Sequence, residues 1–189
     1  MFQLMVQSCR CLAVLTVITG LAYPLLVTGI AQGLFPAAAN GGLIRQNDRV
    51  VGARLIGQPF EGTKYFWGRP SATSPFPYNS ASSSGSNLGP SNPDFRKAVE
   101  GRVATLKAAN PQGGTIPLDL ITASASGLDP HVSPEAALYQ VPRVAAARSV
   151  PVEHVRELIT RFTDAPQFGF LGNSGVNVLL LNQALDRHE

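Results

Sequence analysis

The chain carries, from Leu12 to Phe35, the uncharged and largely apolar run LAVLTVITGLAYPLLVTGIAQGLF. As an α-helix this run would rise roughly 36 Å, enough to cross a hydrocarbon core about 30 Å thick with some tilt. No charged residue occurs between Arg10 and Arg45, so we predict a single transmembrane helix. The chain then divides into a short cytoplasmic N-terminus (1–11), the transmembrane helix (12–35) and an extracytoplasmic domain (36–189).

A cleaved signal peptide is the rival interpretation, because Ala37-Ala38-Ala39 supplies an Ala-x-Ala cleavage motif. The apolar segment of a signal peptide is about 7–15 residues long, and this run is longer, so we expect a retained anchor. Charge leaves the orientation open. Arg10 precedes the run and three arginines follow it, but long domains cross membranes largely regardless of such charges.

Small and polar residues interrupt the apolar run. Pro24 removes a backbone hydrogen bond, Gly29 and Gly33 have small-xxx-small spacing, and Gln32 is polar. Small residues allow helices to approach closely, and glutamine can hydrogen-bond across an interface. We therefore expect Pro24, Gly29, Gln32 and Gly33 to pack against partner membrane helices. The plainer alternative is that Gly and Pro are simply common in membrane helices.

Residues 36–189 are predicted to form one domain of mixed strands and helices, of the α/β or α+β class. Strands are expected at 51–55, 65–67, 116–120 and 168–171, where apolar or aromatic residues alternate or cluster. Helices are expected from Asn92 to Asn110, from Ser133 onward, across 152–162 and across 178–185. Pro142 should kink or end the second of these helices.

The segment from Ser71 to Asp94 differs from the rest of the domain in composition. Seventeen of its 24 residues are Ser, Pro, Asn or Gly. Such a composition is typical of a disordered linker, but Gly, Asn and Pro also specify tight turns. A long ordered loop is usually functional. Composition alone leaves both interpretations open.

One cluster, TASASGLDPH at residues 122–131, gathers hydroxyls, a carboxylate and an imidazole. Catalysis by Ser124 or Ser126 would need a base and an orienting third group, and no G-x-S-x-G elbow is present. Asp-Pro and Ser-Pro are common turn formers. We therefore interpret the cluster first as a structural turn, second as a binding surface and third as a catalytic site.

Other chemistry is weakly represented. The only cysteines, Cys9 and Cys11, supply at most half of a zinc site, and no histidine lies near them. A net charge of +3, scattered over the chain, does not indicate a nucleic-acid partner. We expect no catalytic residue and no metal site.

Several stretches together match one family. They are YPLLVTGIAQ (23–32), FWGRPSA (66–72), SGSNLGPSNP (84–93), TASASGLDPHVSPEAALYQVPR (122–143), FGFL (168–171) and VNVL (176–179). These stretches are spread over nearly the whole length of the chain, and in them the chain resembles the C subunit of the Kdp potassium-transporting P-type ATPase. The family usually has Gly-Ser-Gly at 124–126 and Glu-Pro-Arg at 173–175. This chain has Ser-Ala-Ser and Asn-Ser-Gly there, so an ion pair that relatives make at 173–175 cannot be assumed.

The resemblance implies an accessory subunit, not itself an enzyme, of a potassium uptake pump in the bacterial inner membrane. Its partners would be a channel-like subunit and an ATP-hydrolysing P-type subunit, together with membrane lipid. K⁺ and ATP would be handled by the complex, with no cofactor assigned to this chain. The family has been viewed as a catalytic chaperone that raises the ATP affinity of the pump.

The resemblance also implies that the domain is extracytoplasmic and that the loop 71–94 is ordered. A docking surface would then include Trp67, Arg69, Ser86, Asn87, Asp129 and His131. Two alternatives are kept. One is a free-standing membrane-tethered binding module, and the other is a serine hydrolase that uses Ser124 or Ser126 with His131.

Overall fold

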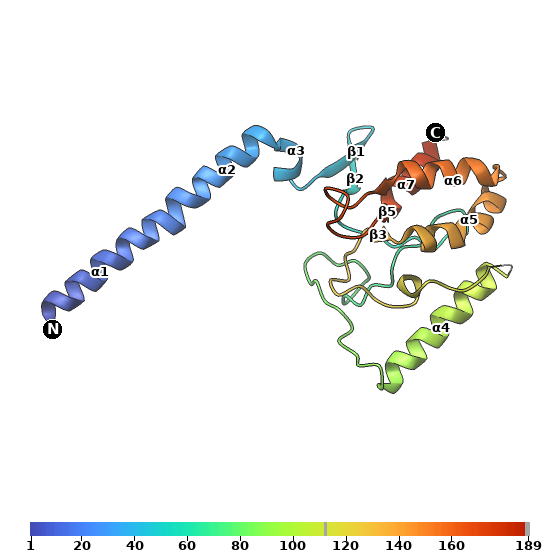
Figure 1. Ribbon diagram of the computed structural model, residues 1–189, viewed down its shortest axis with the longest axis horizontal. Coiled ribbons are helices and arrows are strands. Elements are labelled where there is room, and N and C mark those ends of the chain that lie inside the picture. The colour runs from blue at the N-terminus through green and yellow to red at the C-terminus, as the bar shows by residue number, and fades with distance from the viewer. Residues whose placement is uncertain (112, 188–189) are drawn as a thin grey trace. The chain divides into compact units, whose positions relative to one another are not determined.

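One long helix dominates the N-terminal part of the computed structural model, which describes residues 1–111 and 113–187 (Figure 1). Helix α1 (Phe2–Val17), a π-helical turn (Ile18–Ala22) and α2 (Tyr23–Leu34) follow one another directly. Together they are long and apolar enough to cross a membrane, and no part of their most apolar window is buried by the chain. The prediction of a long apolar helix is confirmed, although the helix already begins at Phe2.

Pro24 lies in the first turn of α2, directly after the π-helical turn. Because proline has no backbone N–H, a carbonyl in the preceding turn loses its usual partner. The turn widens instead, and the amide of Tyr23 donates to the carbonyl of Ile18. The hydroxyl of Thr19 also donates to the carbonyl of Leu15 at 2.8 Å. These local adjustments let a proline occur inside a membrane-spanning helix.

The helix is followed by α3 (Pro36–Ala39) and by a hairpin of β1 (Leu43–Gln46) and β2 (Arg49–Ala53). Both residues of the hairpin turn, Asn47 and Asp48, have positive φ, at 48° and 61°. Tight hairpins favour turns with two such residues, and Asn and Asp adopt that conformation at low cost. The predicted strand near Val51 is therefore confirmed as β2, whereas Leu55 lies beyond its end.

By its contacts the chain divides into two compact units, Met1–Val51 and Gly52–Glu189. The second unit is built on an antiparallel sheet of three short strands in the order β3-β5-β4. These strands are β3 (His131–Val132), β4 (Thr163–Asp164) and β5 (Gly175–Asn177). Its helices are α4 (Pro93–Ala109), α5 (Pro134–Arg148), α6 (Val152–Arg161) and α7 (Val178–Arg187). The predicted class, an apolar helix followed by a mixed helix and small-sheet domain, is confirmed.

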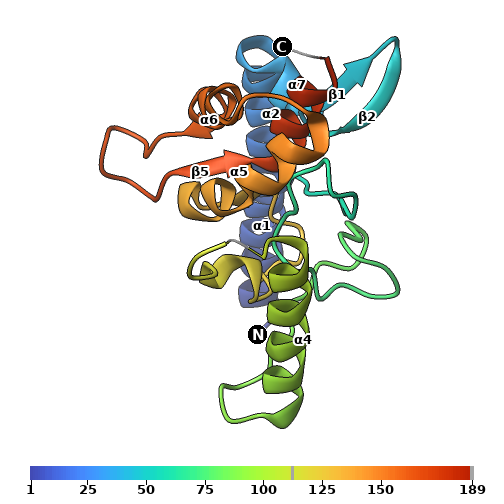
Figure 2. The same cartoon turned by 90° about the vertical axis from the view of Figure 1, so that its right-hand side faces the viewer.

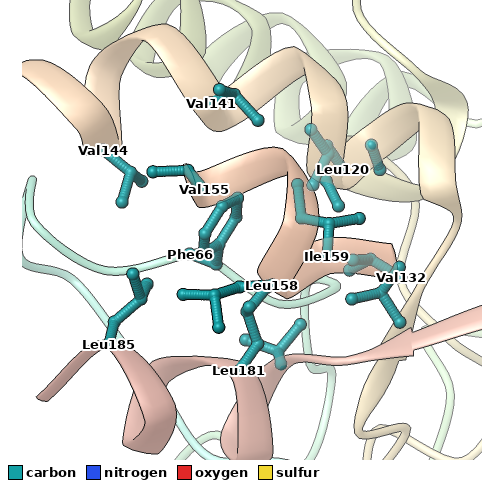
Figure 3. Close-up of a cluster of buried hydrophobic side chains, with 14 of the residues drawn as sticks. Phe66, Leu120, Val132, Val141, Val144, Val155, Leu158, Ile159, Leu181 and Leu185 are labelled. Atoms are coloured by element: carbon teal, nitrogen blue, oxygen red, sulfur yellow. The ribbon is translucent and has the colours of Figure 1, made fainter. Parts of the chain in front are cut away.

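The core lies where α5, α6 and α7 meet the sheet (Figure 3). Val155, Leu158 and Ile159 form the buried face of α6, at the helical spacing that predicted this helix. Phe66 is completely buried at the centre of the cluster. The other labelled members of the cluster are Leu120, Val132, Val141, Val144, Leu181 and Leu185.

Phe66 and Trp67 belong to no strand, although the aromatic run at 65–67 predicted one. Two side-chain amides replace strand partners. Asn182 accepts from the Phe66 amide at 2.8 Å and donates to its carbonyl at 2.9 Å. Gln140 does the same for Trp67, at 2.8 and 3.1 Å. The extended segment therefore lies between α5 and α7 with its backbone polar groups satisfied, as buried groups require.

Helix starts were predicted well. The Asn92 side chain accepts from the Asp94 amide at 2.8 Å, which caps α4, and the Ser133 hydroxyl accepts from Ala136 at 3.1 Å, which caps α5. Pro142 does not end α5, which continues to Arg148. Buried residues on both sides of it, Val141 and Val144, hold the helix in the core.

Two further predicted strands are wrong. Residues Leu118–Leu120 form a 3₁₀ turn, in which Leu118 is exposed and Leu120 is buried. The turn brings Asp119 to the start of α5, where its carboxylate accepts from the Ser133 amide at 2.6 Å. Residues 168–171 lie in a tight turn closed by a bridge between Gln167 and Leu171. Alternation and aromatic content predicted strands in both places, but within the described residues neither segment pairs with a neighbouring strand to form a ladder.

The loop 71–94 is ordered by its own polar side chains. The Ser71 hydroxyl donates to the Gly127 carbonyl at 2.7 Å and accepts from the Tyr78 amide at 2.9 Å. Buried Thr73 and Asn79 make further bonds to the loop backbone. Hydroxyls and amides thus replace the apolar contacts that the loop composition lacks.

Candidate functional site

Five charged side chains form a continuous chain across one edge of the domain, which we call the charge chain. From one end to the other they are Arg69, Asp129, His131, Asp164 and Arg54. Arg69 Nη1 lies 3.2 Å from Asp129 Oδ2, and His131 Nδ1 lies 3.7 Å from Asp129 Oδ1. His131 Nε2 lies 3.3 Å from Asp164 Oδ2, and Arg54 Nη2 lies 3.3 Å from Asp164 Oδ1. The chain links residues from four separate parts of the sequence.

The sheet register explains why His131 can reach Asp164. His131 pairs with Asn177 on one side of β5, and Asp164 pairs with Gly175 on the other side. The imidazole therefore has to cross the central strand near Gly175. A Cβ at that glycine would lie 3.2 Å from His131 Cβ and 3.4 Å from its Cγ, closer than such contacts usually are. A glycine at this position leaves room for the contact between β3 and β4.

The charge chain shifts the pKa values of two of its members, His131 and Asp129. The hydrogen bond to Asp129 is the largest influence on His131 and raises its pKa; burial opposes this, and Asp164 adds to it. For Asp129 the largest influence is burial, which would raise its pKa. Hydrogen bonds from His131 and the nearby Arg69 guanidinium outweigh burial, so the pKa of Asp129 is lowered. Both pKa shifts favour the charged forms of the two side chains, so they strengthen the ion pairs of the charge chain.

The charge chain borders an open cleft of about 810 Å³. Its lining also includes Asp119, Ser133 and Glu135 near the start of α5, residues 173–175, and apolar residues such as Leu118 and Val132. The structure thus brings together three of the residues expected in the docking surface, Arg69, Asp129 and His131. A cleft with this mixture of carboxylates, imidazole and guanidinium can hydrogen-bond to polar groups of a partner.

The other expected docking residues lie elsewhere. Trp67 borders a different cleft of about 560 Å³ beside α4, together with Lys97 and Arg102. Its ring is covered by the Arg143 guanidinium, 4.2 Å from the ring centroid, and its indole N–H donates to the Gly62 carbonyl at 3.1 Å. This geometry supports Trp67 as a packing residue beside its cleft.

Ser86 and Asn87 are exposed on the loop 71–94 and border neither cleft. The preceding residues attach the loop to the turn 124–127. The Ser84 amide donates to the Ser126 carbonyl at 3.0 Å, and Gly85 lies so close to Ala125 that a Cβ would meet its carbonyl oxygen at 2.8 Å. The loop and the turn are therefore packed against each other and form one surface, with the exposed Ser86 and Asn87 next to this contact.

The two serines considered as nucleophiles serve the turn. Ser124 is buried, and its hydroxyl accepts from the Gly127 amide at 2.9 Å. The Ser126 hydroxyl accepts from the Leu128 amide at 3.1 Å. Both are bonds of turn-forming serines. His131 points its ring nitrogens at Asp129 and Asp164 instead.

In the apolar helix, Gly29 and Gly33 have open space where a Cβ would stand. Gln32 already has a partner within the chain, because its amide and that of Asn40 exchange hydrogen bonds at 3.0 and 3.4 Å. The two glycines and Pro24 remain the residues expected to face partner helices, whereas the Gln32 amide is satisfied without one.

Sequence reasoning missed Asp164, Arg54 and Gly175 as members or spacers of the charge chain, and Gln140 and Asn182 as clamps on residues 66–67. One signal was present. An asparagine at position 182 interrupts the apolar run of the closing helix, and a buried amide requires a partner. Only Asp129 and His131 are close in sequence; Arg54, Arg69 and Asp164 lie at least 15 positions from the other members, and no spacing rule would join them.

Comparison with known proteins gives a consistent result over almost the whole chain. The family model "KdpC: K+-transporting ATPase, c chain" matches residues 5–187. A potassium-transporting ATPase KdpC subunit of Sorangium cellulosum is 57% identical over 176 residues, which is 93% of each chain. One of Polaromonas naphthalenivorans is 57% identical, over 92% of this chain and 89% of its own. One of Methylococcus capsulatus is 55% identical over 93% of each chain.

Proposed function

This chain belongs to the KdpC family, the c chain of the K⁺-transporting ATPase, and we propose that within this pump it is a non-catalytic accessory subunit that holds the complex together. The single observation that carries the proposal is the apolar helix. It is long enough to cross a membrane, and none of its most apolar window is buried by the chain itself. A helix with small residues on an unpartnered face is suited to packing against other membrane helices.

The domain supports the same role. The serines of the turn 124–127 bond to backbone amides, and the charge chain is occupied with its own ion pairs. Both are consistent with a scaffold that presents a polar surface to a partner. Partners in this proposal are the channel-like subunit, which carries K⁺, and the P-type subunit, which hydrolyses ATP. These observations favour the accessory subunit over the two alternatives, a serine hydrolase and a free-standing binding module.

The proposal places the C-terminal domain on the extracytoplasmic side of the bacterial inner membrane. Cys9 and Cys11 are exposed and free in α1, so they would report the opposite side. An impermeant thiol reagent applied to intact spheroplasts should label a cysteine introduced at exposed Ser83, but not the native pair. Labelling of the native pair alone would reverse the orientation.

A chaperone effect on ATP affinity is a separable part of the proposal. In this topology the domain lies across the membrane from the ATP, so any effect on ATP affinity would pass through the membrane helices. The effect would then follow assembly of the complex and would need no nucleotide contact in this chain.

The deciding experiment compares two substitutions in the helix. Gly29→Leu fills the open space at the proposed packing face, and Ala31→Leu enlarges a small residue about 200° around the helix, on the other side. We expect Gly29→Leu to reduce co-purification of the partner subunits, with Ala31→Leu much closer to the parent. Potassium-stimulated ATPase per assembled complex should stay unchanged in both. Full assembly of Gly29→Leu, or loss of turnover in an intact His131→Ala complex, would contradict the accessory role.

A further inference from the structure

A second apolar surface lies in the domain, on the turn formed by residues 166–172, which we call the aromatic turn. Phe168 is 86% exposed, Phe170 is 75% exposed and Leu171 is 49% exposed. In Figure 2 the chain between α6 and β5 runs out from the body of the domain as a loop at the left. Isolated exposed apolar residues are normal, but three within four positions at the tip of a loop form a patch.

The aromatic turn is held in a defined shape. The amide of Gln167 donates to the carbonyl of Leu171, and the amide of Leu171 donates to the carbonyl of Gln167, both at 2.9 Å. Phe168 and Gly169 have positive φ, at 54° and 81°, so the chain reverses sharply between the two phenylalanines. A non-glycine residue in that region carries some strain, which the closed turn tolerates. The backbone of the turn is thus fixed by its own hydrogen bonds, while the side chains of Phe168 and Phe170 are exposed.

Charge is missing from this part of the sequence. No Asp, Glu, Lys or Arg occurs from Ala165 to Leu185, and the nearest charged residues in the chain are Asp164 and Asp186. Asp164 is engaged with His131 and Arg54. The aromatic turn therefore offers hydrophobic contact without a charged group that would have to lose water.

We propose that the aromatic turn inserts its two phenylalanines and Leu171 into the interfacial region of the lipid bilayer and so rests the domain on the membrane surface. The size of the patch favours lipid over a protein partner. Two phenylalanines bury at most roughly 150–250 Å² each, whereas a stable protein interface takes about 800 Å² from each partner. A bilayer needs no matching surface, and a few side chains suffice when another part of the chain is already anchored.

The apolar helix already anchors the chain in the membrane, so a weak lipid contact of the domain can suffice. Residues 35–51 join the apolar helix to the domain, and even fully extended they could span no more than about 60 Å. A short tether gives a local concentration of roughly millimolar, so a contact too weak to bind a free domain can still be occupied. The lipid contact would fix the height and tilt of the domain relative to the bilayer, because residues 35–51 are otherwise its only covalent connection to the anchor.

The test uses the full-length chain in phosphatidylcholine vesicles, with Cys9 and Cys11 replaced by serine. A spin label at Ser174→Cys reports the aromatic turn from beside it, and one at Ser80→Cys reports another exposed loop of the same domain. We expect collisions with a water-soluble nickel chelate to be roughly tenfold rarer at residue 174 than at residue 80, because the chelate is excluded from lipid. The double substitution Phe168→Ser with Phe170→Ser should abolish that difference.

Each other outcome overturns the proposal. Equal chelate access at residues 174 and 80 would mean that the turn stays in water. Protection at 174 only after the other pump subunits are added would make the occupant a protein. Protection at both positions would mean that the domain lies on the bilayer by some other face. A matching far-ultraviolet circular dichroism spectrum shows that the serine variant is folded, and the two labels in the parent decide the question without it.

Discussion

Two polar groupings in the same domain join distant parts of the sequence by opposite physical means. The amide clamp, Gln140 and Asn182, is 1% exposed at each residue, and it is neutral. The charge chain is partly exposed and ionised, with its three central members about 28% exposed at the side chain or more. The clamp holds Phe66 and Trp67 inside the core, and the charge chain ties β3 to β4 at the edge of a cleft.

The two groupings therefore differ in what they contribute: the amide clamp stabilises the fold, whereas the charge chain makes stability depend on pH. A buried amide that bonds to backbone N–H and C=O has no protonation state to change, and leaving its partners unpaired costs free energy in full. Partly exposed ion pairs contribute little to stability because water and salt compete for them, but they respond to pH. We expect substitutions in the clamp to destabilise the domain strongly and substitutions in the charge chain to change its stability little but in a pH-dependent way.

The largest effect is expected for Asn182→Leu. The change keeps the side-chain size but leaves the amide and carbonyl of Phe66 buried without partners. We expect the free energy of unfolding to fall by about 2–4 kcal/mol. Urea titration of the full chain in detergent, followed by far-ultraviolet circular dichroism, measures it.

Asn173→Leu is the matched control, because Asn173 is exposed and the same chemical change there should stay within about 0.5 kcal/mol. If Asn182→Leu costs no more than this control, the clamp does not hold the segment and the contrast with the charge chain disappears.

An intermediate effect is expected for Arg143→Met. The guanidinium donates to the Thr63 carbonyl and to Gln140 Oε1 and covers the Trp67 ring. Burial lowers the pKa of Arg143 to about 10, so it stays charged at neutral pH. Methionine keeps an apolar stem, and exposed Thr63 can turn to water, so we expect a loss of about 1–2 kcal/mol.

The loss at Arg143 should be the same at pH 5.5 and pH 8, since both values lie well below its pKa. Unfolding curves at the two pH values check this. A loss that grows or vanishes between them would place Arg143 with the charge chain and not with the clamp.

Much of this architecture was readable from sequence, and the exceptions share a cause. The apolar run, the caps at Asn92 and Ser133, and the closing helix are local patterns, and all were predicted correctly. The two contacts of the amide clamp join residues 116 and 73 positions apart in sequence, and the His131–Asp164 contact joins residues 33 apart. Local periodicity carries no information about such pairs. It was also misleading at Leu118, whose alternation suggested burial while the side chain is exposed.

In the candidate site, too, some residues could be expected from the sequence and others depend on contacts that only the fold creates. Arg69, Asp129 and His131 were expected through the family resemblance, and the structure brings them together. Gly175 could not be recognised as part of the site. Its importance depends on the sheet register, which places it beneath the imidazole. The sequence showed the departure from the family pattern at 173–175. Only the structure shows its consequence, which is that Gly175 leaves room for the His131 ring to reach Asp164.

Gly175→Ala should sharpen the comparison with a small effect on stability. The added Cβ would crowd His131 at about the distance where the ring must shift, so contact with Asp164 should weaken. We expect a loss of stability below about 1 kcal/mol and a fall in the pKa of His131 toward its ordinary value. Titration of the His131 ring protons by NMR measures the second effect. An unchanged pKa would show that Asp164 contributes nothing to it.

The smallest effect, and the one most specific to the charge chain, is the pH dependence that His131 gives to stability. Its pKa is raised in the folded state, so its contribution is fully present below the ordinary value of about 6.5 and is lost as pH rises through the raised value. The pKa of Asp129 is lowered, so its contribution is present above about 3.9 and is lost as pH falls through the lowered value. Both contributions are complete together only between about pH 4 and pH 6.5.

His131→Ala should therefore be less stable than the parent at pH 5.5, by no more than about 1 kcal/mol because the pair is partly exposed. The difference should be smaller at pH 9, because the contribution of His131 is lost as pH rises through its raised pKa and the imidazole loses its charge. Urea midpoints of both proteins at the two pH values measure it, and raising the salt concentration at pH 5.5 should reduce it further. A deficit that is equal at pH 5.5 and pH 9 would mean that His131 acts by packing alone. The charge chain would then resemble the amide clamp, and the contrast between them would fail.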